Sequence, residues 1–173
     1  AVGCATARRP EGPYFDLNDE PLICQTADGG SIDASPYRHA DGSLFLLWKN
    51  DGNAVGRRSW ICSQRLSDDG GELVGERVRL MTTTEAWEGD LVEGPFLFPR
   101  RGRLHLFYSA NAYAGDRYAV GHAVCETPLG PCRKSPGPWM ASAGAARGPG
   151  HGMVVEAGGR TWMFHHAWRR GDR

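Results

Sequence analysis

Three polar residues suited to a hydrolytic site recur at closely similar intervals along the chain. Asp33 lies in the sequence SIDASP, Glu93 in LVEGP and His151 in GPGHGM, so the successive spacings are 60 and 58 residues. Two carboxyl groups in one cleft can divide the work of acid catalysis, since one donates a proton to a leaving oxygen while the charge of the other helps it to keep that proton. Glu93 follows an apolar pair and precedes Gly-Pro, and partial desolvation favours a protonated carboxyl group. We therefore predict that Glu93 is the acid and that Asp33 orients and modulates it.

An internal repeat explains the spacing of these residues. The segments DGSLFLLW, RGRLHLFY and GGRTWMFH begin at residues 41, 101 and 158, and the tripeptide AVG occurs at residues 1 and 119. All these intervals are close to 59 residues or to twice that length. Short apolar and aromatic runs separated by many of the 24 glycines and 11 prolines predict β-strands joined by tight turns. A repeat of that kind is typical of radially arranged four-stranded propeller blades, and less so of a solenoid.

The repeat divides the chain into about three blades. We expect a partial blade over roughly 1–30, blades over 31–90 and 91–148, and a further partial blade over 149–173. The first strand of a blade lies innermost, so the three polar residues should meet at a central channel. Because a propeller closes through four or more blades, we expect the sequence to be an internal fragment with blades missing at both ends.

The composition excludes several classes of partner. Lys and Arg number 20, as do Asp and Glu, so there is no net charge to attract nucleic acid or an anionic membrane, and no apolar run is long enough for a membrane span. The five cysteines show no spacing suited to zinc and are interpreted as small buried apolar residues, although a Cys125–Cys132 bridge is compatible with the sequence. A neutral substrate therefore fits best.

Taken in order, these motifs resemble glycoside hydrolase family 43 over nearly the whole chain. The resemblance rests on SIDASP before Asp41-Gly42, on VEGP, on GPGH followed by HHAW at 165–168, and on TPLGP at 127–131. It implies an all-β, five-bladed β-propeller and an inverting hydrolase, in which one Asp activates water, a second Asp modulates the pKa of the acid, and a Glu protonates the leaving group. Asp33 matches the modulator and Glu93 the acid.

The same resemblance implies what this chain lacks. The general base of the family would lie on a blade upstream of Ala1, so we expect residues 1–173 alone to be inactive. His151 matches a channel histidine that contacts substrate or water, and a calcium ion can bind near it in the family. No other cofactor is expected.

Further residues are candidates for binding an oligosaccharide or polysaccharide. Trp87 could be a platform for a sugar ring or a core residue, and Asn50, Asn111 and Tyr113 could bind sugar hydroxyls, although Asn often has a purely turn-forming role. Glu88 and Asp90 are expected to cap their loop rather than to act as the acid.

The loop sequences favour an arabinanase or α-L-arabinofuranosidase within the family. KNDGN after one strand and YSAN at the end of another resemble those members, which implies pentose-containing plant polysaccharides of the arabinan or arabinoxylan type. A β-xylosidase of the same family is the alternative substrate class. A carbohydrate-binding propeller without catalysis is the alternative of a different kind.

Overall fold

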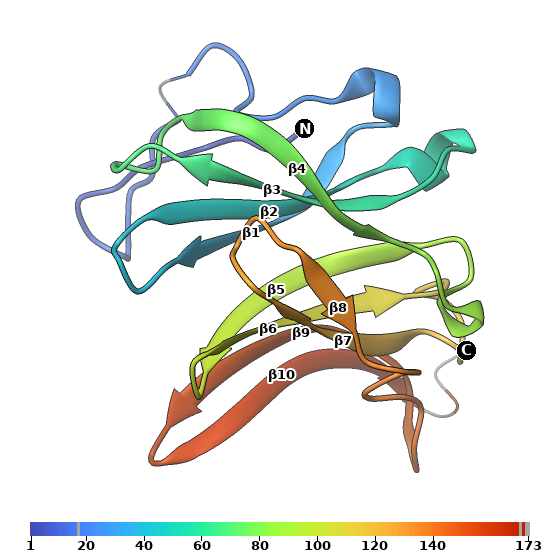
Figure 1. Cartoon of the computed structure of the whole chain (residues 1–173). Coiled ribbons are helices and arrows are strands. Elements are labelled where there is room, and N and C mark those ends of the chain that lie inside the picture. Colours follow the sequence, from blue (N-terminus) through green and yellow to red (C-terminus); the bar gives the residue numbers. More distant parts are fainter. Residues whose placement is uncertain (17, 170, 172–173) are drawn as a thin grey trace.

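The computed structural model describes residues 1–16, 18–169 and 171, and within them the regular structure is almost entirely β. Its strands form two four-stranded sheets and one two-stranded sheet, which are stacked in chain order (Figure 1). Three short 3-10 helices lie in the connections: η1 (Thr26–Asp28), η2 (Gly52–Val55) and η3 (Ala86–Glu88). In this part of the chain no helix is long and apolar enough to cross a membrane. The predicted all-β class with four-stranded antiparallel units is confirmed.

The first sheet consists of four consecutive antiparallel strands. These are β1 (Ser31–Arg38), β2 (Leu44–Asn50), β3 (Trp60–Leu66) and β4 (Leu73–Thr82), in that spatial order. The turn between β1 and β2 depends on Gly42, at φ 90°, and on the Asp41 carboxylate, which accepts a 2.9 Å hydrogen bond from the Ser43 N–H.

Strand β2 is apolar along nearly its whole length because both of its faces are covered. Leu47 faces the second sheet, whereas Leu46 and Trp48 face the opposite way and pack with Val2 and Ile23 of the N-terminal segment. Isolated β-bridges join parts of that segment to one another, including Val2 to Ile23, and the Trp48 indole N–H donates a 2.6 Å hydrogen bond to Gln25. The described residues of 1–30 otherwise form loops and η1.

The second sheet repeats the order of the first. It contains β5 (Val92–Arg100), β6 (Arg103–Ala110), β7 (Ala119–Cys125) and the short β8 (Cys132–Lys134). Cys125 and Cys132 are paired residues of β7 and β8 and form a disulfide. The bridge that the sequence left open is therefore present, while Cys4, Cys24 and Cys62 are free.

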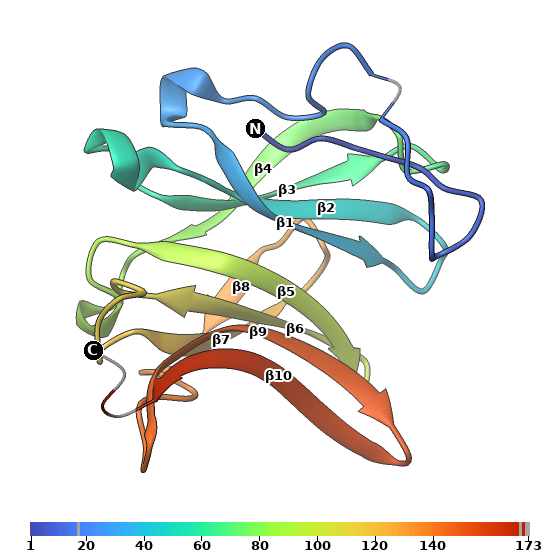
Figure 2. The ribbon, with the colours of Figure 1, turned by 180° about the vertical axis from the view of Figure 1, so that it is seen from behind.

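The third sheet is a hairpin of β9 (Ala146–Ala157) and β10 (Arg160–Arg169). Figures 1 and 2 both show β5 lying between the first sheet and this hairpin. Val154 packs against Phe107 and Val120 of the second sheet, whereas Trp162 and Phe164 remain exposed.

The largest apolar core fills the space between the first two sheets. Leu47 and Ile61 from the first sheet meet Val92, Leu106 and other side chains of the second. These four residues have essentially no exposed surface, so their burial contributes on the order of 2 kcal/mol each to folding. The core sets the distance between the sheets, and through it the distance between the innermost strands β1, β5 and β9.

Candidate active site

A β-bulge interrupts each innermost strand at the place where the predicted site residues lie. In β1 the pairing shifts between Ile32 and Ser35, and in β5 it shifts between Glu93 and Phe96. In β9 the shift comes between Gly150 and Met153, the partners of His166 and Phe164. An extra residue in one strand re-aims the side chains around it, and bulges are frequent beside active sites.

The bulges correct one prediction about register. Asp33, Gly94 and His151 share the unusual positive φ, at 57°, 54° and 53°, and are therefore the equivalent positions on the three strands. Glu93 lies one residue earlier, on the rung of the second sheet that corresponds to the rung of Ile32 in the first sheet. The prediction that Glu93 occupies the position of Asp33 was therefore wrong. The true spacings are 61 and 57 residues, and connections of unequal length hid the one-residue shift.

The equivalent positions nevertheless lie against one another. The backbone N–H of Gly94 donates a 2.9 Å hydrogen bond to Oδ2 of Asp33. A β-carbon added to Gly94 would lie 3.1 Å from Nδ1 of His151. The Gly94 backbone is therefore in contact with Asp33 on one side and with His151 on the other, and Glu93 is attached directly to it.

Glu93 is held by two donors, one on each carboxylate oxygen. The Lys49 ammonium lies 3.2 Å from Oε2, and the Tyr118 hydroxyl donates a 2.6 Å hydrogen bond to Oε1. The side chain of Lys49 is 2% exposed and that of Glu93 13% exposed. Burial, and then the charge of Glu93, raises the pKa of the Tyr118 phenol, so its hydroxyl keeps its proton.

His151 is positioned by its backbone and lies close to a second histidine. Its N–H donates a 2.7 Å hydrogen bond to the buried hydroxyl of Ser109. The ring centroids of His151 and His166 are 6.3 Å apart, and His166 in turn stacks on Tyr118 with an interplanar angle of 5°.

Calcium near His151 stays a prediction. Within the described residues no three His, Cys, Asp or Glu side chains are grouped so as to hold a metal ion. His151 would supply a single nitrogen, and calcium prefers oxygen ligands, so the ion would need oxygens from water or substrate.

The two predicted asparagine ligands both make hydrogen bonds within the protein. Asn50 is buried; its amide donates to the Arg58 carbonyl at 3.2 Å and accepts from the Trp60 N–H, which closes the loop around η2. Asn111, at φ 73°, donates to the Trp87 carbonyl and accepts from the N–H of the next residue, both at 2.9 Å. These bonds fit the turn-forming alternative, and a role of either amide in binding sugar stays a prediction.

The two aromatic candidates differ from each other. Trp87 is partly buried and packs on the main core, with its ring centroid 6.1 Å from that of Tyr108, so the core alternative holds for it. Tyr113 is 59% exposed, and its ring remains available to a ligand. Its role in binding stays a prediction.

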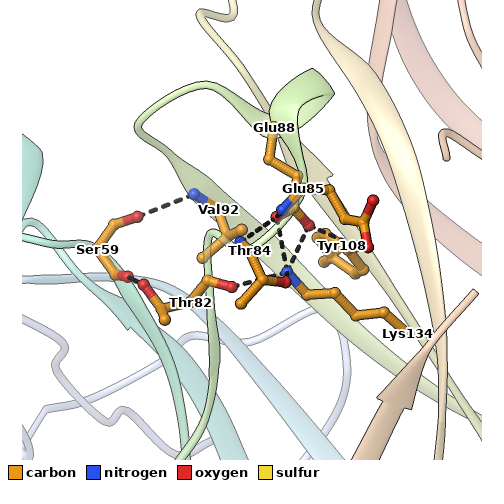
Figure 3. A network of polar contacts seen from close by, with 8 residues as sticks. All are labelled: Ser59, Thr82, Thr84, Glu85, Glu88, Val92, Tyr108 and Lys134. Carbon is orange, nitrogen blue, oxygen red and sulfur yellow. Dashed lines mark hydrogen bonds and ion pairs between the residues drawn. The ribbon is translucent and has the colours of Figure 1, made fainter. Parts of the chain in front are cut away.

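Glu88 caps its loop, as expected from the sequence. Its side chain and that of Glu85 form a capping box around η3, and Glu88 accepts hydrogen bonds from the N–H groups of Thr84 and Glu85. Figure 3 shows it meeting the Lys134 ammonium and the Tyr108 hydroxyl, the latter at 2.7 Å. Burial alone would raise the pKa of Glu88, but the hydrogen bonds from Lys134 and the two N–H groups outweigh it and lower that pKa.

This network also fixes the start of β5. Lys134 donates to the Thr82 carbonyl at 2.7 Å, the Thr82 hydroxyl donates to the Ser59 carbonyl, and the Ser59 hydroxyl accepts from the Val92 N–H at 2.9 Å (Figure 3). Val92 directly precedes Glu93. The buried polar groups therefore position the backbone from which Glu93 projects.

The comparison with known families decides which class of protein this is. The family model described as glycosyl hydrolases family 43 matches residues 1–173. The chain belongs to glycoside hydrolase family 43.

Individual curated proteins resemble the chain over part of their own length. The β-D-galactofuranosidase xynD of Aspergillus niger is 28% identical over 171 residues, covering 96% of this chain and 46% of that protein. An extracellular exo-α-(1→5)-L-arabinofuranosidase of Streptomyces chartreusis is 30% identical over 149 residues, covering 79% of this chain and 44% of that protein. The chain thus spans about half the length of these curated relatives.

A solved structure supports the propeller architecture. A thermostable family 43 glycoside hydrolase superimposes with a TM-score of 0.82 at 31% identity, covering 94% of this chain and 56% of that chain. The sheets described above therefore correspond to part of a five-bladed family 43 propeller, as the resemblance implied.

Two residues of the candidate site were missed by sequence reasoning. Lys49 lies in KNDGN, which was considered for its asparagine and for its resemblance to arabinanases, and Tyr118 precedes the AVG repeat without a motif of its own. A lysine at the end of an otherwise apolar strand was the available signal, since a buried ammonium requires a carboxylate partner. Its partner Glu93 is 44 residues away, which no local pattern could show.

Proposed function

We propose that this chain carries the acid half of an inverting glycosidase site, with Glu93 as general acid and Asp33 as its modulator. The observation that carries the proposal is the hydrogen bond from the Gly94 N–H to Asp33. It holds a second carboxylate beside the residue that directly follows Glu93. Hydrolysis of a glycosidic bond uses two carboxyl groups on opposite faces of the sugar, and a further carboxylate near the acid favours its protonated form.

The reaction would proceed by direct displacement. Glu93 transfers its proton to the glycosidic oxygen, and the bond between that oxygen and the anomeric carbon breaks with its electrons passing to the leaving group. A water molecule, losing a proton to the base, forms the new bond from the other face. His151 and Tyr113 are the side chains proposed to contact the sugar.

We place the base outside residues 1–173, so the chain alone would be inactive. The motifs match the modulator and the acid of the family but none matches the base, and the chain spans about half the length of its curated relatives. Asp51, a further carboxylate near Glu93, is already paired with the Lys49 ammonium at 3.1 Å.

The proposed substrate is an arabinofuranosyl linkage in arabinan or arabinoxylan. The loop sequences favour this class, and the two relatives above are named for arabinofuranose and galactofuranose, both five-membered sugar rings. A β-xylosidase remains the alternative, because another similar protein is named xylosidase/arabinosidase 43A, from Humicola insolens.

The test uses the complete protein that contains these residues. Aryl α-L-arabinofuranosides, β-D-galactofuranosides and β-D-xylopyranosides should be assayed side by side, with the product anomer followed by proton NMR. We expect the arabinofuranoside to be cleaved with inversion, and Glu93→Gln to lower kcat by about 10²–10⁴-fold with the fold intact. Binding of arabino-oligosaccharides without turnover would instead establish the non-catalytic propeller.

A further inference from the structure

Lys49 reaches from the first sheet to the acid of the second. It lies at the end of β2, on the rung that pairs with Ile32, and its ammonium crosses to Oε2 of Glu93. The equivalent rung of the second sheet behaves in the same way, since the Ser109 hydroxyl crosses to the backbone of His151 in β9. The two contacts follow the same pattern: a residue of β2 positions β5, and a residue of β6 positions β9.

The two donors to Glu93 are not chemically equivalent. An ammonium can only donate, so Lys49 occupies one lone pair of the Glu93 oxygen that it faces, and its positive charge disfavours a proton on that oxygen. A phenolic hydroxyl can turn and accept, so the oxygen that faces Tyr118 can carry a proton. A general acid must be protonated when the glycosidic bond breaks, and the arrangement of the two donors favours Oε1 as the oxygen that delivers the proton.

We propose that Lys49 is a positioning residue: it binds Oε2 of Glu93 and thereby makes Oε1 the proton-delivering atom. Asp51 bonds to the same ammonium and so weakens the interaction between Lys49 and Glu93. This inference rests on the proposed function, and it adds the residues that orient the acid. Once Oε1 has given up its proton, the ammonium neutralises the resulting carboxylate in a largely desolvated position.

Several other groups act on Glu93 from the elements packed around it. In order along the chain, the titratable and charged groups in contact with Glu93 or with its immediate neighbours are Asp33, Lys49, Asp51, Tyr118, His151 and His166. Among these Lys49 is the permanent cation, so its removal should have the largest effect on the ionisation of Glu93.

The chain offers a matched control, because it contains two lysines and each pairs with a glutamate. Lys134 bonds to the buried Glu88, in the network that supports η3 and the start of β5, and makes no ion pair with Glu93. Lys134→Met therefore removes a buried ion pair of the same kind, and shows how far a disturbance of the β5 backbone alone shifts the titration of Glu93.

The experiment is a side-chain carboxyl titration by ¹³C NMR on this chain, with the Glu93 signal identified by its loss in Glu93→Gln. We expect Lys49→Met to raise the titration midpoint of that signal by about 1–3 pH units. Asp51→Asn should lower the midpoint, Lys49→Arg should keep it near that of the parent chain, and Lys134→Met should shift it far less than Lys49→Met does. Opposite shifts for Lys49→Met and Asp51→Asn cannot arise from general loss of structure.

The proposal is overturned if Lys49→Met and Asp51→Asn shift the midpoint in the same direction, or if Lys134→Met moves it as far as Lys49→Met does. Should Lys49→Met fail to fold by circular dichroism, Asp51→Asn still decides, because Asp51 is partly exposed; no downward shift would contradict the proposal. In the complete protein, the basic limb of the kcat/KM profile should move with the NMR midpoint. Shifts in this chain without hydrolysis by the complete protein would leave the positioning role intact and refute the proposed function.

Discussion

Gly94 and His151 are in such close contact that a single methyl group would force them apart. Gly94 has φ 54°, and a β-carbon there would approach Nδ1 of His151 to 3.1 Å. The same residue donates its N–H to Asp33. The bulge in β5 is thus the point where the three innermost strands meet.

Gly94→Ala should therefore destabilise the protein more than backbone strain alone explains. Gly102, in the turn between β5 and β6, is the matched control, since it has φ 72° and nothing within 4 Å of the position that an added methyl group would take. We expect Gly102→Ala to lower the free energy of unfolding by about 1 kcal/mol and Gly94→Ala by at least about 2 kcal/mol, measured by urea denaturation. Equal losses for the two variants would show that the His151 contact is relaxed without cost.

Glu88 should make stability depend on acid pH in a defined direction. Its pKa is lowered in the folded protein, so the stability it contributes is complete above the ordinary value of 4.5 and is lost as the pH falls below that value through the folded pKa. We expect Glu88→Gln to lower the free energy of unfolding at pH 7 by about 3–5 kcal/mol, because it leaves Lys134 without its anionic partner.

The difference in free energy of unfolding between Glu88→Gln and the parent chain should then become smaller below pH 4.5. Urea denaturation at pH 7 and at successively lower pH measures it. Asp69→Asn, at an exposed carboxylate, is a control expected to cost far less at pH 7. A difference in free energy of unfolding that stays constant with pH would contradict a lowered pKa of Glu88.

Substitution of Trp87 should affect mainly stability, and substitution of Tyr113 should affect mainly binding. Trp87→Leu removes part of a ring packed on Tyr108 and should lower the free energy of unfolding by about 1–3 kcal/mol, with sugar affinity unchanged. Tyr113→Ala should change stability by less than about 0.5 kcal/mol and weaken binding of arabino-oligosaccharides, measured by calorimetry on the complete protein. Reduced affinity in folded Trp87→Leu would restore the sugar-platform role to Trp87.

Local patterns were sufficient for the strands and for the identity of the motifs. Strand β2 follows from an apolar run bounded by Asp41-Gly42 and by the polar residues after Trp48, and alternation and turn chemistry act within a few residues. The capping role of Glu88 was equally local, because its partners Thr84 and Glu85 are its neighbours in sequence.

Local patterns could not show the contacts between distant residues at the site. For Asn50 the sequence left a ligand role and a turn-forming role both open, because its partners Arg58 and Trp60 lie beyond a loop whose closure the sequence does not show. The register of Glu93 was misjudged by one residue because a bulge adds a residue to the strand without changing its composition.

The sequence by itself determined the repeat, the all-β class and the residues Asp33, Glu93 and His151, because these depend on residue type and on short-range periodicity. Only the tertiary structure decided which way those residues point and what holds them. The bulges turn Glu93 toward Lys49 and Tyr118 and place Gly94 between Asp33 and His151. The physical reason is that an ion pair or hydrogen bond between strands of different sheets depends on how the sheets pack, and packing is a property of the whole core.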